Sequence, residues 1–244
     1  MESQPKIPIF LTILIIALLA VIFMIYKNYQ TELTGKSFLL MVYLYIIVGL
    51  LFIAVVGKLT ESMSITDAAN TWKLTILYFV MACGGISLMM SNQFLVNHTG
   101  YILMLLALGL IMGSLYKYGI NVAWAATITA IIVAVLTLVV FNSSEESLLK
   151  MASWLPNLTS ILCIIIIIEL IYMFFFGYNS TFTTIMSISI VVLFAFFILS
   201  DTSRILGEAK NLQCNTQMCI NYPLRASGLV LDYYNMFVAL VYTR

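Results

Sequence analysis

Long apolar runs, separated by short polar segments, dominate the sequence. A helix needs about 20 apolar residues to cross a hydrocarbon core about 30 Å thick, and the chain contains about eight runs of that kind. They cover residues 7–26, 37–56, 74–90, 101–116, 122–141, 158–176, 181–199 and 226–242. A backbone in lipid must satisfy its own hydrogen bonds, so these runs predict helices rather than strands. The pattern therefore predicts an all-α integral membrane protein, a polytopic bundle of about eight transmembrane helices.

The composition agrees with a membrane location and excludes a soluble protein. Hydrophobic residues make up 63% of the 244 residues and charged residues only 9%, whereas soluble domains contain roughly 25% charged residues. The polar segments are too short to fold outside the bilayer, so lipid is the expected environment of the whole chain. The net charge is +1, and no segment carries the basic cluster that binds nucleic acid. We therefore expect no nucleic-acid partner.

Residues that usually carry enzyme or metal chemistry are sparse. His98 is the single histidine and falls in a short polar stretch, where a solvated or capping side chain is expected. Cys214 and Cys219 supply fewer ligands than the three or four that zinc needs, so no metal site is predicted. They are either free thiols or a local disulfide, which requires an oxidising compartment. No phosphate-binding loop or nucleophile motif is present, so we predict no catalytic residue, no resident cofactor and no enzyme.

An acidic residue inside an apolar run is the first candidate for function. Glu169 stands near the middle of the run 158–176, where an ionisable side chain costs at least roughly 2.5 to 3.5 kcal/mol on insertion scales. No Lys or Arg is predicted at membrane depth, which favours protonation or a hydrogen bond over an ion pair. Two interpretations stay open: an ion or proton site, and a protonated residue that holds helices together.

Two aspartates form the second candidate site. Asp201 follows the seventh run, and Asp232 lies six residues after Ala226, about 9 Å into the last helix. The two helices are consecutive and antiparallel, so both aspartates fall at a similar depth below the same membrane face and are expected to meet. Asn235 lies three residues after Asp232, on the same helical face. Two adjacent carboxyl groups would share a proton and titrate as a unit.

The ends of the last two runs also carry short motifs. The seventh run ends in Ser200-Asp201-Thr202, and the last run contains Leu229-Val230-Leu231-Asp232-Tyr233-Tyr234-Asn235-Met236-Phe237. In the Bax-inhibitor-1 family, the transmembrane Bax inhibitor motif proteins, the penultimate helix has a Tyr-Asp-Thr-like end. The final helix of that family carries a Leu-Tyr-Leu-Asp-x-x-Asn-Leu-Phe pattern. The sequence resembles this family over about residues 198–240, and upstream it agrees with the family in hydropathy alone.

The resemblance implies a function for the aspartates. In that family, paired aspartates form a pH-sensitive latch in a calcium-permeable pore, and their protonation state sets whether the last helix closes it. Carried over, Asp201 and Asp232 would be the latch, with Asn235 as a supporting polar group. Two carboxylates supply fewer than the six to eight ligands that Ca²⁺ prefers, so any Ca²⁺ would bind transiently. The implied function is a Ca²⁺ or proton leak that moderates cell death.

Two features depart from the family pattern. The family has seven spans, so we assign residues 1–36 to an added N-terminal transmembrane helix and short loop. Residues 37–244 would then form a Bax-inhibitor-like seven-helix domain. The family can also use an intramembrane arginine near the aspartates, whereas Arg204 and Arg225 are expected at the membrane surface. An ion-pair gate of that kind is therefore not predicted.

A structural role is the alternative. A chain with almost nothing outside the bilayer could anchor membrane or capsid proteins, for example in the inner membrane of a large virus, through the polar segment 200–225. An intramembrane aspartyl protease is disfavoured because Asp201 follows Ser200 and Asp232 follows Leu231, so the Tyr-Asp and Gly-x-Gly-Asp motifs are absent. The sequence leaves the host membrane open between an endomembrane and a virion inner membrane.

Overall fold

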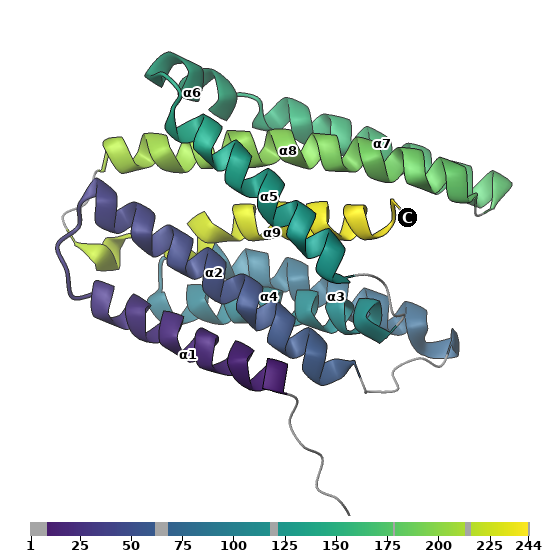
Figure 1. Ribbon diagram of the computed structural model, residues 1–244, viewed down its shortest axis with the longest axis horizontal. Helices are drawn as coiled ribbons and strands as arrows, with labels where there is room; N and C mark the ends of the chain where they lie inside the picture. Colours follow the sequence, from purple (N-terminus) through teal and green to yellow (C-terminus); the bar gives the residue numbers. More distant parts are fainter. Residues whose placement is uncertain (1–8, 62–67, 118–121, 178, 213–215, 244) are drawn as a thin grey trace, which may run out of the picture. The chain divides into compact units, whose positions relative to one another are not determined.

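The computed structural model describes residues 9–61, 68–117, 122–177, 179–212 and 216–243, and all regular structure in these ranges is helical. The helices are α1 (Ile9–Asn28), α2 (Gly35–Thr60), α3 (Ala68–Met89), α4 (Phe94–Lys117), α5 (Val122–Phe141), α6 (Glu145–Ala152), α7 (Leu155–Phe176), α8 (Ser180–Lys210), the short 3₁₀ helix η1 (Gln217–Cys219) and α9 (Tyr222–Val241) (Figure 1). The all-α prediction is confirmed, and every predicted run corresponds to a helix.

Several of these helices are long and apolar enough to span a membrane. In the ranges described, six segments meet that requirement by length and composition, and they lie in α1, α2, α4, α5, α7 and α8. The apolar part of α3, Ile76–Met89, is shorter. Helix α9, which carries Arg225, Asp232 and Asn235, is not among them. The chain is thus an all-α polytopic membrane protein.

Two helices extend beyond the predicted apolar runs. Helix α4 begins at Phe94, so His98 lies inside a helix and not in a loop as predicted. Its Nε2 atom shares a hydrogen bond of 2.5 Å with the Tyr45 hydroxyl, and this contact places the imidazole inside the helical packing. Helix α8 does not end at Leu199 but continues to Lys210. In both cases the hydropathy pattern located the apolar part of the helix and missed its polar extension.

A short helix also occupies the segment 142–157, which was predicted as a loop. Helix α6 begins after Ser144, whose side chain caps it by accepting a hydrogen bond of 3.3 Å from the backbone N–H of Ser147. Its Leu148 side chain is only 3% exposed. The pattern that marks α6 consists of a capping serine and one buried apolar residue. It is too short to stand out from the hydropathy of the chain as a helix.

The chain divides into two compact units. The first unit is Met1–Ile120 with Cys214–Ser227, and the second unit is Asn121–Gln213 with Gly228–Arg244. Helix α9 therefore begins in the first unit and continues in the second.

Glycines set the helix packing of the first unit, in which α4 packs against α2 and α3, and α1 packs against α2. Gly109 and Gly113 stand four residues apart on α4, a spacing that permits a close helix contact. That contact is with α2, since a Cβ atom on Gly109 would lie 2.6 Å from the Cβ of Val56. On the other side of α4, a Cβ on Gly85 would lie 2.6 Å from the carbonyl oxygen of Gly100. The backbones of α3 and α4 therefore touch.

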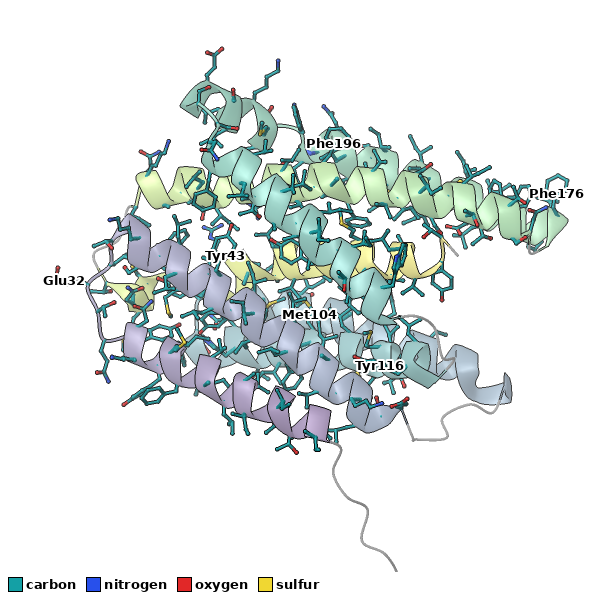
Figure 2. All side chains as sticks on the ribbon, in the orientation of Figure 1. Glu32, Tyr43, Met104, Tyr116, Phe176 and Phe196 are labelled. Atoms are coloured by element: carbon teal, nitrogen blue, oxygen red, sulfur yellow. The ribbon has the colours of Figure 1, made fainter. Side chains whose placement is uncertain are left out.

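Hydrogen bonds hold the segment before α9 onto the first unit. The Gln217 amide donates to the Ser37 hydroxyl at 3.0 Å and to the carbonyl of Glu32 at 3.3 Å, in the turn between α1 and α2 (Figure 2). The Tyr222 hydroxyl donates to the Gln217 side-chain oxygen, and the Asn221 amide donates to the carbonyl of Met89 at 2.7 Å. Residues 217–222 belong to the polar segment 200–225. They are therefore held by hydrogen bonds to α3 and to the turn between α1 and α2.

Helix α8 is the centre of the second unit and packs against α5, α6 and α7. Helices α7 and α8 run side by side and are joined by a tight turn, with Phe176 at that end of the pair (Figures 1 and 2). Gly177 in this turn has φ +72°, a conformation that favours glycine. Asn179 then caps α8 by accepting a hydrogen bond of 3.0 Å from the N–H of Phe182.

Replacing Gly85 by alanine should destabilise the protein, because the new methyl group would meet the backbone of α4. We expect a loss of about 1 to 3 kcal/mol, the usual cost of overpacking. Gly84→Ala is the matched control, since a Cβ atom there meets nothing within 4 Å, and its effect should stay within about 0.5 kcal/mol. Thermal unfolding of both variants in detergent micelles, followed by circular dichroism, measures the difference. Equal Tm values would contradict the contact.

Candidate functional site

One turn of α8, residues 200–203, is buried on all sides although every residue in it is polar. Asp201 is 5% exposed, and the three neighbours are each 1% exposed. Helix α6 covers part of this turn: the Ser200 hydroxyl donates to the carbonyl of Ala152 at 3.5 Å, and the Ser203 hydroxyl donates to the Met151 sulfur at 3.5 Å. The short helix that the sequence pattern missed therefore shields the turn that carries the first aspartate.

Arg204 lies beside Asp201. Its Nη2 atom is 3.4 Å from Asp201 Oδ1, in a pair three residues apart on the same helix. The Asp201 side chain is 7% exposed and the Arg204 side chain 37%, so the guanidinium reaches from the buried carboxylate towards the surface of the chain. Arg204 was expected at the membrane surface, and no ion pair with the aspartates was predicted. Helix α8 continues past Leu199 to Lys210 and keeps Arg204 one turn from Asp201, so the two side chains do pair.

Asp232 lies opposite this pair, on α9. Its side chain is 6% exposed and interacts electrostatically with both Asp201 and Arg204. One turn earlier on α9, a Cβ atom on Gly228 would collide with Asp201 Oδ2. The α9 backbone therefore approaches the Asp201 carboxylate directly, and only a glycine leaves room for it. The structure brings the two aspartates together with one arginine.

This cluster leaves polar atoms unsatisfied. Among the residues described, Asp232 Oδ2 has no hydrogen-bond partner, and Asp201 Oδ1 has only its ion-pair contact with Arg204, although both atoms are buried. Burying a polar atom without a partner costs free energy, and burying an unpaired charge costs more. If both carboxyl groups were ionised, their two negative charges and the one positive charge of Arg204 would leave a net charge of −1. The arrangement can therefore take up a proton, a water molecule or a cation.

The other predicted residues, Asn235 and Glu169, line a cleft that neither aspartate lines. Asn235, expected to support the aspartates, lines a cleft of about 490 Å³ between α7, α8 and α9, and Glu169 lines the same cleft. Glu169 is half-buried, so it neither lies in a closed core nor points only to the outside. In the described part of the chain, no group of three or more His, Cys, Asp or Glu residues is placed to hold a metal ion.

For Cys214 and Cys219 the sequence left two alternatives open, free thiols and a local disulfide. Cys219 is disulfide-bonded, and Cys83 and Cys163 are free thiols. Cys214 lies outside the described residues, so its pairing with Cys219 stays a prediction.

Arg204 and Gly228 are the site residues that sequence reasoning missed. The first could have been found from its position three residues after Asp201, where opposite charges on a helix meet. The second stands one turn before Asp232, and a glycine inside a helix often marks a close approach. Which group approaches it depends on how α8 and α9 pack.

Comparison with known proteins identifies a family for the chain. A family model described as inhibitor of apoptosis-promoting Bax1 matches residues 35–243, a range that begins at α2 and includes both aspartates and Arg204. Neither the curated proteins nor the solved structures include a significant match. The family match covers most of the chain, which therefore belongs to the Bax inhibitor-1 family of membrane proteins.

Proposed function

We propose that the protein is a leak for Ca²⁺ or protons that moderates cell death, with Asp201 and Asp232 as a pH-sensitive latch. Membership of the Bax inhibitor-1 family supports a Bax-inhibitor-like membrane protein in general. The observation that carries the finer mechanism is the pair of buried carboxyl groups on consecutive helices, with Arg204 beside Asp201.

The latch works through the charge balance of three side chains. With both carboxylates ionised, Arg204 offsets one of them, and the remaining negative charge has to be balanced in a medium of low dielectric constant. A proton would bind one carboxyl group and relieve the repulsion between α8 and α9. A cation passing through would do the same in an ionised pair. Protonation and cation occupancy therefore compete for one position.

Gly228 makes the position of α9 sensitive to this balance. The α9 backbone lies directly against the Asp201 carboxylate, so a change in the charge or hydration of that group acts on the helix without an intervening side chain. Only two carboxylates are present, fewer than the six to eight oxygen ligands of a stable Ca²⁺ site, so Ca²⁺ would be held in passing and partly hydrated. Asn235, one turn beyond Asp232, offers the next polar group along α9.

Neutralising both aspartates should remove the pH dependence of ion flux. Wild-type protein in liposomes should pass Ca²⁺ at rates that differ between about pH 6 and about pH 8, whereas the Asp201→Asn/Asp232→Asn double variant should show about the same rate at both. A Ca²⁺-sensitive dye inside the vesicles measures this. Wild-type flux that is absent at both values, from folded helical protein, would overturn the proposal and favour anchoring of membrane or capsid proteins.

Removing the charge of Arg204 should move the pH dependence. Without the guanidinium, the ionised form of the pair loses its stabilising partner, so the pair should take up a proton at higher pH. The midpoint of flux against pH in Arg204→Gln should therefore shift upward. Lys210→Gln is the control, because it removes a positive charge from the exposed end of the same helix. A midpoint that moves equally in both variants would indicate a general effect of net charge, and it would contradict a specific role for the Arg204–Asp201 ion pair.

Adding a methyl group at Gly228 should disturb the latch without changing any charge. The Cβ atom in Gly228→Ala meets Asp201 Oδ2, so α9 has to shift away from the carboxylate, and the ratio of flux at the two pH values should change by about tenfold. Gly207→Ala, where a Cβ atom meets nothing within 4 Å, should leave the ratio as in wild type. An unchanged ratio in Gly228→Ala would show that the contact does not control the flux.

A further inference from the structure

The second unit contains a cleft that the proposed latch does not use. It has a volume of about 490 Å³, lies between α7, α8 and α9, and has neither Asp201 nor Asp232 in its described lining. Sites for small organic molecules usually have volumes of about 300 to 1,000 Å³, with mostly apolar walls and a few polar groups. Most of the described lining of this cleft is apolar, and Glu169 is its single charged residue. The cleft therefore has the size and the composition of a site for an organic ligand.

The contact between α8 and α9 shows which lining residues of these two helices share a level. The helices run in opposite directions (Figure 1), and a Cβ atom on Gly228 would collide with the Asp201 carboxylate. Phe194 lies as many residues before Asp201 as Asn235 lies after Gly228, so these two lining residues are level.

The turn between α7 and α8 relates the third helix to the other two. Glu169 lies eight residues before Gly177, and Ser187 lies eight residues after Asn179, so Glu169 and Ser187 are level in the α7–α8 pair. Tyr242 follows Asn235 by seven residues, and Ser187 precedes Phe194 by seven, which brings Tyr242 to the same level. One carboxylate and two hydroxyl groups therefore stand together at one end of the cleft.

The cleft is apolar along most of its remaining length. Ile166 and Ile190 form the next level after Glu169, and Leu162 and Phe194 form the level after that. The far level is about 10 Å from Glu169, at 1.5 Å per residue, and Asn235 is the polar residue found there. This order of one polar end and a long apolar wall matches an amphiphile with a small head and an alkyl tail.

The charge of the polar end selects the head group. No Lys, Arg or His belongs to the described lining, and none of the ion pairs among the described residues involves Glu169. Glu169 lies in an apolar segment long enough to cross a membrane, where a carboxylate is costly unless a positive charge accompanies it. One carboxylate supplies too few ligands for a metal ion. An ammonium group needs only this carboxylate and one or two hydroxyl oxygens, because it brings three N–H donors of its own.

The direction of the cleft agrees with the orientation of a lipid in a bilayer. Helix α7 ends at Phe176, about 10 Å beyond Glu169, so the polar end of the cleft is nearer to this end of the helix. The apolar wall runs from Glu169 towards Leu162, deeper into the apolar segment. A membrane amphiphile could therefore enter with its head towards one face and its tail towards the middle of the bilayer.

We propose that this cleft binds a single-chain lipophilic amine from the membrane. The ammonium head donates hydrogen bonds to the Glu169 carboxylate and to the hydroxyl oxygens of Ser187 and Tyr242. The alkyl tail lies along the apolar wall that ends at Leu162 and Phe194. The site goes beyond the leak, because amine binding at Glu169 does not require that ions cross the membrane or that the aspartates act as a latch.

Photolabelling of the full-length protein tests the site. The probe is a primary long-chain alkylamine with a diazirine near the end of its chain, and the matched probe is the alcohol with the same chain. Protein in phosphatidylcholine nanodiscs is illuminated with either probe, and mass spectrometry of peptides locates the adducts. We expect the amine to label the peptides around Leu162 and Phe194 with about ten times the yield of the alcohol, because only the amine pairs with Glu169.

An excess of the unlabelled amine should suppress this adduct. Equal yields from the two probes, or an adduct that the unlabelled amine does not displace, would overturn the proposal. Both comparisons use the wild-type protein, so they do not depend on the folding of a variant.

Variants separate the site from the latch and from general charge effects. Glu169→Gln keeps the shape of the side chain and should lower the amine adduct by about tenfold, to the level of the alcohol. Glu146→Gln is the matched control, because it removes a carboxylate from an exposed position on α6. The Asp201→Asn/Asp232→Asn variant should keep the amine adduct even where its flux is altered. Loss of the adduct in that variant, or equal effects of the two glutamate changes, would contradict an independent site.

Discussion

The burial of two carboxyl groups on consecutive helices is the constraint on which the second unit depends. An acidic side chain inside an apolar bundle has to be shielded and partly balanced, and the local structure does both. Helix α6 covers the polar turn of α8, Arg204 lies beside Asp201, and Gly228 lets α9 approach without a side chain in the way. Two buried oxygen atoms still have no hydrogen-bond partner among the residues described. The shielding of the two carboxyl groups is therefore more complete than the balancing of their charge.

The first unit is organised by contacts of another kind. Its helices approach closely at glycines, and the segment before α9 is held by the side chains of Gln217, Asn221 and Tyr222. Helix α9 begins in this hydrogen-bonded region and carries Asp232 further along the same helix. Helix α9 is thus held by hydrogen bonds at its beginning and carries a buried aspartate near its middle.

Acidic chemistry in the second unit occurs at two places along α9. The aspartate pair has an arginine beside it, and the described residues that line the cleft with Glu169 are uncharged. Arg204 offsets one of the two aspartates in the first place, and the described lining of the second includes no cationic side chain.

The amino-acid sequence by itself determined where the long apolar helices lie, because a run of about 20 apolar residues in lipid satisfies its backbone hydrogen bonds as a helix. It also indicated the family, because the motif around Asp232 lies within one short segment. It also identified Asp201, Asp232 and Glu169, since an acidic residue among apolar ones is visible without a structure. Tertiary structure decided the rest: that α8 continues past Leu199 to carry Arg204, that Gly228 meets the Asp201 carboxylate, and that Asn235 and Glu169 share a cleft. These relations join residues on different helices or beyond an apolar run. They depend on packing, which hydropathy along the chain does not encode.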